Sequence, residues 1–325
     1  MKRPAVGVGL IGLGRHGLRY ARHLLEDIPD ARLIAVCRRD PSQGFPLPAP
    51  YPIEMMGQVA DLIHHPAVEV VVSVTPPHLS PLICSTAVEA GKPLLIEKPL
   101  ATTEAAGEDM VRRAGKAGVP LMVAQTLRFN RSLEAFRCRL SELGLIHSLN
   151  ITLTVPTRPR PPENPGFGGR GALLDLGIHT LDLARYLTGT CPRVEACWLD
   201  HLPPAGLDTR ADIRLSTAQG LTLEVLVAWS QFSRVGTAEA AGPGGRLSVD
   251  WVNDHLIDRR NGKLPIEWTE ANQPTIVAVL AGFLEAILHN RPVPVPGQEG
   301  LEALKLVEAC YRMAICRETV GPEQA

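Results

Sequence analysis

The stretch that decides the fold of the first part of the chain reads Gly12-Leu13-Gly14-Arg15-His16-Gly17. Residues 5–11 before it are apolar and typical of a short buried strand, and residues 15–26 after it carry apolar side chains at helical spacing. Between a strand and a helix, the pattern Gly-x-Gly-x-x-Gly allows a tight turn, a close approach of the backbone to a pyrophosphate, and close helix–strand packing. The helix N-terminus adds N–H groups for phosphate oxygens. The segment therefore predicts a site for the pyrophosphate of a dinucleotide cofactor.

Short apolar stretches alternate with helical patterns up to residue 124. Strands are expected at residues 32–37, 68–74, 93–97 and 120–124, and helices at 56–64, 79–90 and 103–117. The proline-rich residues 40–53 are expected to form a loop. Strands that are apolar on both faces and alternate with helices form a parallel sheet that is covered on both sides. Residues 1–124 are therefore predicted to form a Rossmann domain, which is a doubly wound α/β fold.

After residue 125 the pattern changes to strands that follow one another without helices between them. Strands are expected at residues 147–155, 193–200, 210–217, 221–229, 234–240 and 245–251, and helices at 131–143, 172–187, 274–289 and 298–317. Residues 156–171, which are rich in Pro, Gly and Arg, are expected to form a loop. Successive strands joined by short turns favour antiparallel pairing. Residues 125–325 are therefore predicted to form an α+β domain with a mainly antiparallel sheet.

Length and composition limit the class of protein. The chain has 325 residues, enough for two domains, and a formal net charge of −1, which provides no basic face for nucleic acid. No apolar stretch is long enough to span a membrane, and the N-terminal residues lead into a strand rather than a signal-peptide core. The seven cysteines contain no Cys-x-x-Cys pair, which favours free thiols over a zinc site. We expect a cytoplasmic protein with a small-molecule substrate and no metal, nucleic-acid or membrane partner.

The residues after the second predicted strand bear on which cofactor binds. In NAD-binding Rossmann folds, an acidic residue at this position binds the ribose 2′-hydroxyl. Here Arg38 and Arg39 follow Cys37 instead. Two guanidinium groups suit a 2′-phosphate, so the sequence favours NADP over NAD. Two alternatives remain, because Asp40 could reach the ribose or Arg38 could stack on the adenine of NAD.

Polar residues at strand and helix ends are the catalytic candidates. Two polar segments come directly after buried strands, at the edge where open α/β sheets bind ligands: Thr75-Pro76-Pro77-His78 and Glu97-Lys98-Pro99. Asp175 and His179 lie four residues apart near the start of a predicted helix, which places them on one face, and Asp182 shares that face. Taken alone, such a pair is more often a surface pair than a catalytic one.

In combination, these motifs resemble the glucose–fructose oxidoreductase, inositol dehydrogenase and MocA (Gfo/Idh/MocA) family. The motifs are residues 12–17, 75–78 (TPPH), 90–99 (AGKPLLIEKP), 127–130 (LRFN) and 171–179 (GALLDLGIH). The resemblance covers nearly the whole chain. It implies an NAD(P)-dependent dehydrogenase or reductase that acts on a CH–OH group of a sugar, cyclitol or related compound. It also implies an open sheet in the second domain, used for contacts in a homo-oligomer (dimer or tetramer), and an active site between that sheet and the carboxyl edge of the Rossmann sheet.

The resemblance also implies roles for individual residues. The predicted catalytic residues are Lys98, Asp175 and His179. His179 would act as the base, Lys98 would stabilise a developing alkoxide, and Asp175 would orient the substrate, although Lys98 and His179 could exchange roles. The predicted cofactor-binding residues are Gly12, Leu13, Gly14, Arg15, His16, Gly17, Arg38, Arg39, Thr75, Pro76, His78, Glu97, Lys98 and Gln125. The predicted substrate contacts are Arg128, Asn130 and Arg160, and Arg158 and Arg170 could also meet an acidic substrate or remain solvated.

The chain departs from the family pattern at two places, and two other functions fit the same motifs. Arg38 stands where most members have an acid, and the proline-rich residues 40–53 stand where relatives usually have a helix. One alternative function is an NAD-dependent glycosidase that oxidises C3 transiently and regenerates its cofactor. The other is a non-catalytic dinucleotide-binding sensor, against which the complete set of Lys98, Asp175 and His179 argues.

Overall fold

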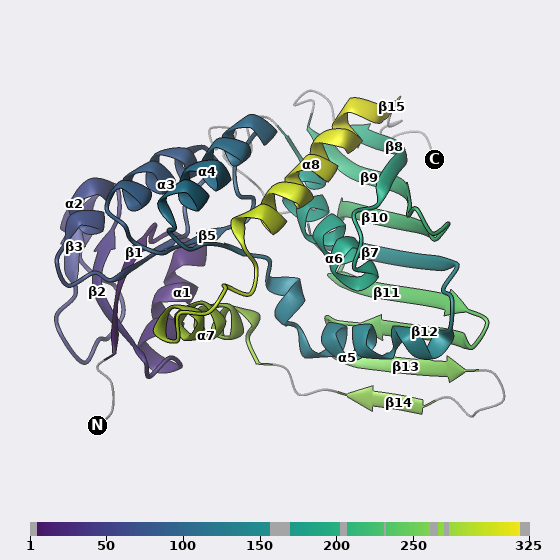
Figure 1. Cartoon of the computed structure of the whole chain (residues 1–325), viewed down its shortest axis with the longest axis horizontal. Coiled ribbons are helices and arrows are strands. Elements are labelled where there is room, and N and C mark those ends of the chain that lie inside the picture. Colours follow the sequence, from purple (N-terminus) through teal and green to yellow (C-terminus); the bar gives the residue numbers. More distant parts are fainter. Residues whose placement is uncertain are drawn as a thin grey trace. The chain divides into compact units, whose positions relative to one another are not determined.

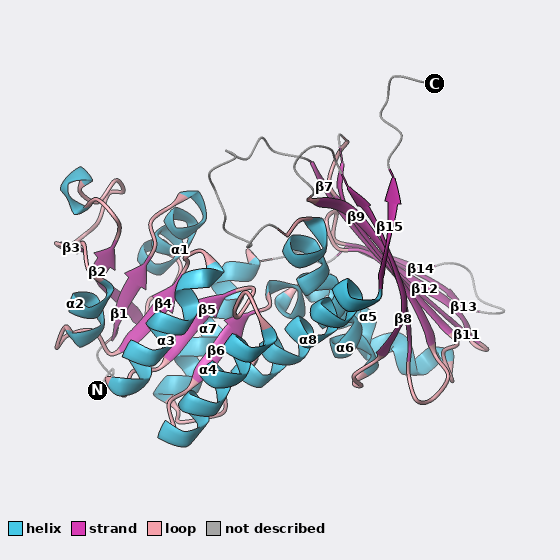
Figure 2. Cartoon of the chain, turned by 90° about the horizontal axis from the view of Figure 1, so that it is seen from above, coloured by secondary structure: helices cyan, strands magenta, loops and turns pink. Residues whose placement is uncertain are grey.

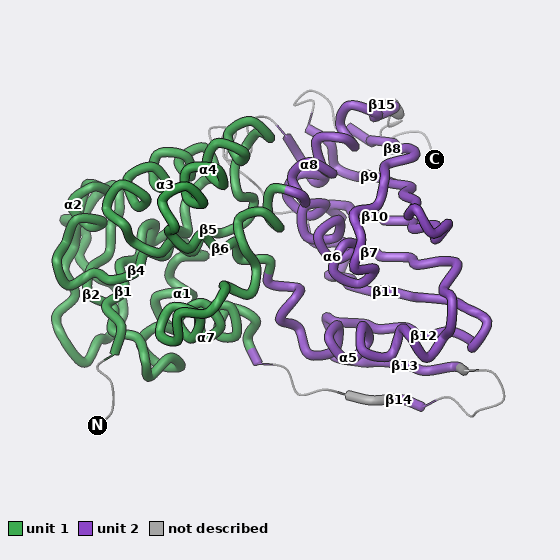
Figure 3. The backbone as a smooth tube through the Cα atoms, in the orientation of Figure 1, with its two compact units in different colours: residues 1–125, 274–301 green, residues 126–273, 302–325 purple. Residues whose placement is uncertain are grey.

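The computed structural model describes residues 5–156, 170–201, 207–230, 232–260, 266–269 and 273–318. The chain divides into two units, which Figure 3 shows in different colours. The first contains residues 1–125 and 274–301, and the second contains residues 126–273 and 302–325. The division predicted between residues 124 and 125 lies beside the first of these boundaries. Residues 274–301, by contrast, belong to the first unit, although they follow the second domain in sequence.

A parallel sheet of six strands forms the centre of the first unit (Figure 1). Its strands are β1 (Val6–Ile11), β2 (Ala31–Cys37), β3 (Glu54–Met56), β4 (Val70–Ser73), β5 (Leu94–Glu97) and β6 (Leu121–Ala124). Their spatial order is β3-β2-β1-β4-β5-β6, so the winding reverses between β1 and β4. Strands β1, β4, β5 and β6 are buried at every position, because helices cover both faces. The predicted Rossmann fold is confirmed.

Helices lie on both sides of this sheet (Figure 1). They are α1 (Arg15–Glu26), α2 (Val59–His64), α3 (Ser80–Glu89), α4 (Glu104–Ala117) and α7 (Thr275–Leu288). Helix α7 contacts α1 and β6, and it buries Ile276, Val279, Leu280, Phe283, Leu284 and Ala286. The Val123 N–H, on β6, donates to the carbonyl of Val295 at 3.0 Å. The chain therefore returns to the first unit because this apolar helix completes the cover of the Rossmann sheet.

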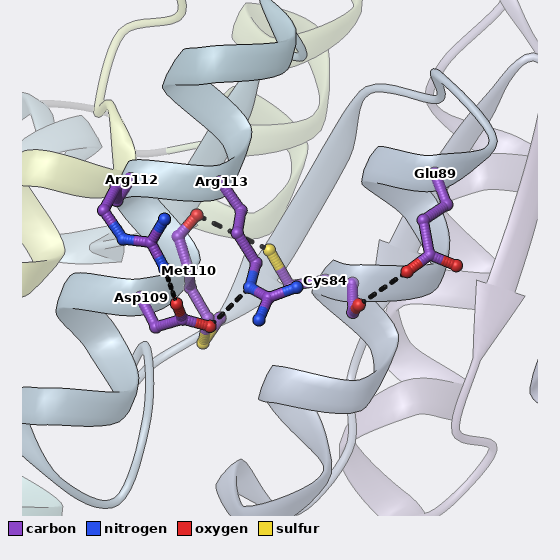
Figure 4. A network of polar contacts seen from close by, with 7 residues as sticks. Cys84, Glu89, Asp109, Met110, Arg112 and Arg113 are labelled. Carbon is purple, nitrogen blue, oxygen red and sulfur yellow. Dashed lines mark hydrogen bonds and ion pairs between the residues drawn. The ribbon is translucent and has the colours of Figure 1, made fainter.

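Side chains of α3 and α4 show how two neighbouring helices of this unit are joined (Figure 4). The buried Cys84 thiol on α3 donates to the Met110 carbonyl on α4 at 3.9 Å. Burial raises the pKa of Cys84 to about 11, so this thiol is not a reactive thiolate at neutral pH. On the exposed surface of α4, Asp109 pairs with Arg112 and Arg113. Exposed pairs of this kind contribute little to stability, so buried contacts hold the two helices together.

The second unit contains a sheet of nine strands. They are β7 (Ser148–Pro156), β8 (Arg193–His201), β9 (Asp208–Ser216), β10 (Thr222–Ser230), β11 (Val235–Gly242), β12 (Gly245–Asp250), β13 (His255–Arg260), β14 (Ile266–Thr269) and β15 (Ala314–Glu318). Their spatial order is β14-β13-β12-β11-β7-β10-β9-β8-β15. All neighbouring pairs are antiparallel except β7–β10 and β8–β15. The prediction of a mainly antiparallel open sheet is confirmed.

Helices pack against one face of the nine-stranded sheet (Figure 2). Helix α5 (Arg131–Arg139) contacts β12 and β13, and α6 (Ile178–Thr188) contacts β7 and β10. The last helix, α8 (Gly297–Met313), ends earlier than predicted, because the following residues form β15 beside β8. Strands β3, β13, β14 and β15 were not predicted. Each has six residues or fewer, so pairing with a neighbouring strand decides its conformation rather than its own pattern.

Packing of α1 against β1 depends on the absence of a side chain at Gly17. A Cβ there would lie 2.0 Å from the Gly12 carbonyl oxygen, so Gly17→Ala must displace α1 and should lower the free energy of unfolding by about 2 kcal/mol or more. Gly115, inside α4, has nothing within 4 Å of the same position, so Gly115→Ala should raise stability by up to about 1 kcal/mol. Urea unfolding of both variants measures the difference. Equal effects would contradict the packing described.

Candidate functional site

The turn after β1 has the shape that a pyrophosphate requires. Gly12 has φ +95°, and a Cβ there would lie 2.3 Å from the carbonyl oxygen of Val74, so only glycine fits this position. Gly14 has nothing within 4 Å of an added Cβ, which leaves open space over the backbone. Gly14 also stands at the N-terminus of α1 without a side-chain cap, and the first turn of the helix has no acidic residue. The open backbone and uncapped helix end fit the phosphates of a dinucleotide.

The residues after β2 present a cation where NAD-binding folds carry an acid. The Arg38 backbone N–H donates to the Met56 carbonyl at 3.0 Å, and its guanidinium donates to the Gln43 side chain. Asp40 accepts hydrogen bonds from the Ser42 N–H and hydroxyl and from the Gln43 amide. These bonds hold the pKa of Asp40 below its ordinary value. The Asp40 carboxylate therefore caps the 3-10 turn at Pro41–Gln43.

The loop after β4 lies beside the turn after β1. An added Cβ on Gly12 would lie 3.1 Å from Cγ2 of Thr75, and the Thr75 hydroxyl is 2.9 Å from that of Ser73. Pro76 and His78 are exposed. The loop at residues 75–78 and the glycine turn at residues 12–17 are thus neighbours in the structure.

The carboxylate of Glu97, at the end of β5, forms a buried polar cluster in the first unit. Its Oε1 atom lies 2.7 Å from Nε2 of His16 and accepts a 2.6 Å hydrogen bond from the Tyr20 hydroxyl. Its Oε2 atom accepts a 3.0 Å bond from the backbone N–H of Lys98. Burial by itself would raise the pKa of Glu97, but the bonds from His16 and Tyr20 and the charges of His16 and Lys98 lower it. Glu97 is therefore an ionised carboxylate that binds protein donors.

Gln125 follows β6 and is 1% exposed. Within the described part of the chain, neither its amide nitrogen nor its amide oxygen has a hydrogen-bond partner. Buried polar atoms in proteins almost always have partners, so both atoms fit a polar group supplied from outside the protein. A donor and an acceptor side by side suit a carboxamide or a water molecule.

Asp175 and His179, in the second unit, stand on an irregular helical segment. Residues Leu173–Gly177 form a π-helical turn that continues into α6. Asp175 lies in the π-helical turn and His179 in the first turn of α6, and both are half-buried. The indole N–H of Trp229 donates to Asp175 at 3.3 Å. Single π-helical turns inside α-helices are frequent at functional sites. The spacing of four residues was recognised in the sequence, but the widened turn was not.

Asp208 at the start of β9 holds the beginning of this helical segment. Its carboxylate accepts bonds from the N–H groups of Gly171 (2.8 Å) and Leu173 (2.6 Å), and from the hydroxyl of Tyr311 (2.9 Å). Burial and the neighbouring Asp208 raise the pKa of Tyr311, so the hydroxyl remains a donor. Arg170, one of the arginines that could have met an acidic substrate, instead pairs with Glu308 and lies 4.8 Å over the Tyr311 ring.

Two of the predicted substrate contacts, Arg128 and Asn130, bind other groups of the protein. Arg128 forms a two-point ion pair with Asp182, at 2.7 and 2.8 Å, and Asp182 is 1% exposed. Asp182 therefore points inward, although the sequence placed it on the face of Asp175 and His179. Asn130 is buried and caps α5 through a bond from the Leu133 N–H. Arg158 and Arg160 lie outside the described residues.

Two further properties of the described residues limit the kinds of site present. They contain no helix long and apolar enough to cross a membrane. They also contain no group of three or more His, Cys, Asp or Glu side chains arranged to hold a metal ion.

The fold and the turn after β1 define an NAD(P)-binding oxidoreductase. Residues 6–125 match the model of the oxidoreductase family with an NAD-binding Rossmann fold, and residues 139–248 match the GFO/IDH/MocA C-terminal domain. The chain belongs to the GFO/IDH/MocA family of dehydrogenases and reductases. The resemblance recognised in the sequence is confirmed.

Named relatives and solved structures agree with this assignment. The chain is 24% identical to the scyllo-inositol 2-dehydrogenase (NADP(+)) of Bacillus subtilis, over 98% of this chain and 96% of the relative. It is 26% identical to the D-apiose dehydrogenase of Paraburkholderia graminis, over 94% of this chain and 86% of the relative. The aldose-aldose oxidoreductase of Caulobacter crescentus, solved with glycerol, superposes with a TM-score of 0.82 at 25% identity, covering 95% of this chain and 97% of that one.

The carboxylate of Asp208 should be worth far more to stability than another aspartate on the same strand. Asp208→Ala removes a buried acceptor of three hydrogen bonds and should lower the free energy of unfolding by about 3 kcal/mol. Asp212→Ala removes a partly exposed carboxylate that pairs with Arg210 and should cost less than about 1 kcal/mol. Urea unfolding compares the two variants. A similar loss from both would show that Asp208 does not hold the helix start.

Proposed function

We propose that this chain catalyses the reversible oxidation of a CH–OH group in a sugar, cyclitol or related hydroxy or keto compound, and that it prefers NADP to NAD. The observation that carries the proposal is the position of Lys98. It follows Glu97, whose carboxylate contacts His16 in the pyrophosphate turn. The backbone of Lys98, a residue whose ammonium can transfer a proton, is therefore tied to the turn proposed to hold the dinucleotide. The relatives named for scyllo-inositol and D-apiose support a polyhydroxylated substrate.

The proposed chemistry divides between proton transfer and charge stabilisation. A bound nicotinamide ring supplies the hydride acceptor or donor. His179 would take the hydroxyl proton of the substrate, since an imidazole titrates near neutral pH. Lys98 would donate a hydrogen bond to the same oxygen and stabilise its negative charge. Asp175, held by the Trp229 N–H, would orient the substrate, and Lys98 and His179 could exchange roles.

The proposed cofactor contacts follow the carboxyl edge of the Rossmann sheet. The turn at residues 12–17 would hold the pyrophosphate through backbone N–H groups, with the loop at residues 75–78 beside it. Gln125 would offer its unpartnered amide to the cofactor. Glu97 would act indirectly, since both of its oxygens already accept bonds from the protein.

The preference for NADP rests on the residues after β2. Arg38 and Arg39 provide two guanidinium groups, and the Asp40 carboxylate is occupied by Ser42 and Gln43. Of the two alternatives left open by the sequence, the bonds of Asp40 disfavour its reaching a ribose hydroxyl. A relative named as NADP(+)-dependent supports the same preference.

We propose a supporting role for Arg128 and Asn130 rather than contact with the substrate. The pair with Asp182 ties the residues before α5 to α6, on which His179 stands. Asp182 is almost fully buried, so breaking the pair with Arg128 would leave an uncompensated negative charge in the low-dielectric interior.

The outer face of the nine-stranded sheet supports the proposal of a homo-oligomer. It carries a groove of about 430 Å³ whose lining includes Trp198, Asp212, Arg214 and Glu224. Arg214 pairs with Glu224 and lies 5.9 Å over the Trp198 ring. An aromatic side chain among charged ones is common at protein interfaces. Sedimentation velocity tests the proposal, with a monomer as the contrary result.

The two alternative functions differ from this proposal in how the cofactor behaves. A glycosidase with transient C3 oxidation would release product without net change in NADPH. A sensor would bind NADPH and a ligand but turn over neither. Net formation of NADPH on addition of a polyol would therefore support the proposed dehydrogenase over both.

Removal of the Lys98 ammonium should affect catalysis far more than cofactor binding. Lys98→Met and His179→Asn should each lower kcat about 100-fold or more, with a loss of NADPH affinity of less than about tenfold. Lys92→Met is the matched control, because its ammonium only donates to the His65 carbonyl. Rates would be measured on the best substrate in a panel of inositols and aldoses. Unchanged turnover in Lys98→Met would overturn the proposed mechanism.

The guanidinium of Arg38 should set the preference between the two cofactors. Arg38→Ala should weaken NADPH binding about 10- to 100-fold while it changes NADH binding little, because only NADPH carries the 2′-phosphate. Arg32→Ala is the control, since Arg32 lies on β2, the strand that precedes Arg38, and its guanidinium stacks on the Tyr51 ring at 5.1 Å. Fluorescence titration of the cofactor-free protein measures both affinities. Tighter binding of NADH than NADPH by the unmodified chain would be the contrary result.

A further inference from the structure

The hydroxyl group of Tyr20 contacts the buried carboxylate of Glu97 in the first unit. Tyr20 lies on α1 and is fully buried. Its hydroxyl donates to Oε1 of Glu97 at 2.6 Å. Burial and the nearby charge of Glu97 raise the pKa of Tyr20 well above its ordinary value, so the hydroxyl stays protonated. A phenol that remains protonated beside a carboxylate is a permanent hydrogen-bond donor.

His16 and Tyr20 present two groups from one face of α1 to the same oxygen. They are four residues apart, and their rings meet edge-to-face with centroids 5.4 Å apart. Both polar tips reach Oε1 of Glu97, at 2.7 and 2.6 Å. His16 belongs to the turn proposed to hold the pyrophosphate. One carboxylate oxygen therefore joins the first turns of α1 to the end of β5.

The other oxygen of Glu97 fixes the backbone of the next residue. Oε2 accepts a 3.0 Å bond from the N–H of Lys98. With Oε1 held by two donors and Oε2 by a third, the carboxylate cannot rotate without breaking a hydrogen bond in a buried place. The direction of the Lys98 peptide is thereby tied to α1. The negative charge of Glu97 also stays next to the Lys98 ammonium.

We propose that Tyr20 is a positioning residue for the reaction, which acts on Lys98 by holding the carboxylate of Glu97. The inference rests on the proposed role of Lys98 in catalysis. Loss of the Tyr20 hydroxyl leaves Oε1 with a single donor, so the carboxylate can turn and the Lys98 backbone can move with it. The charged and titratable groups around the cluster are His16, Glu97, Lys98 and Arg19.

The proposal is tested by measuring whether the effect of Tyr20→Phe on kcat requires the Lys98 side chain. Tyr20→Phe, Lys98→Met and the double variant would be prepared in the full chain, and kcat, KM and NADPH affinity measured on the best inositol or aldose substrate. Tyr20→Phe should lower kcat about tenfold, with KM and NADPH affinity within about threefold. In the double variant kcat should equal that of Lys98→Met, because a residue that acts only through Lys98 has no effect once Lys98 is gone.

Controls separate positioning from general damage to the fold. Tyr51→Phe removes another phenol of the first unit, whose hydroxyl accepts a bond from the Leu33 N–H at 3.1 Å, and should leave kcat unchanged. Glu97→Gln removes the charge but keeps the shape of the side chain, and it should also lose its effect in the Lys98→Met background. This variant provides the same test if Tyr20→Phe does not fold.

The possible results distinguish the positioning role of Tyr20 from the proposed function of the chain. If Tyr20→Phe leaves kcat unchanged, or if its effect multiplies with that of Lys98→Met, the positioning role is overturned while the proposed function stands. If Lys98→Met itself retains full turnover, the proposed mechanism fails and the inference fails with it. Loss of the Tyr20 effect in the double variant supports both.

Discussion

The buried carboxylate of Glu97 is the constraint on which the candidate chemistry of the first unit depends. Removing a carboxylate from water is costly unless donors replace the water, and this one has three donors from two separate segments. Two of them come from α1 and the third from the residue after β5. The requirement to satisfy one charge therefore fixes the start of α1, the end of β5 and Lys98 as a single rigid piece.

In the second unit, too, a buried carboxylate is satisfied by hydrogen-bond donors from the protein, and this carboxylate belongs to Asp208. Asp208 is 2% exposed and accepts bonds from two backbone N–H groups and a tyrosine hydroxyl. It fixes the start of the segment that carries Asp175 and His179, whereas the Arg128–Asp182 pair fixes the helix further along. In both units a buried carboxylate holds short segments that carry the side chains proposed to be catalytic. Such rigid support is what a catalytic group needs, because small displacements weaken proton transfer strongly.

The sequence was sufficient for the fold, but it did not reveal the contacts made by the candidate residues. The strands of the Rossmann sheet are continuous apolar runs, and the glycine turn has a mechanism that depends on local backbone, so both could be predicted. The short strands β13, β14 and β15 depend on pairing with neighbouring strands of the sheet, and β15 pairs with the distant β8. None of them carries a pattern of its own. The contact between Tyr20 and Glu97 could not be predicted from the sequence either. On α1 it is one apolar position among several, and only the fold brings Glu97, 77 residues later, to its hydroxyl. The family resemblance implied a substrate contact for Arg128, but the fold supplies Asp182 as its partner.

The most direct test of this account is the ionisation of Glu97 itself. Carbon-13 NMR of protein labelled at the glutamate carboxyl carbons, with Glu97→Gln to assign the signal, follows this group as pH falls from neutral. The donors and neighbouring charges lower its pKa, so the account predicts an ionised Glu97 at neutral pH and a midpoint below the ordinary glutamate value of about 4.3. A midpoint well above that value would show that burial outweighs the donors, and it would contradict the role given to Glu97.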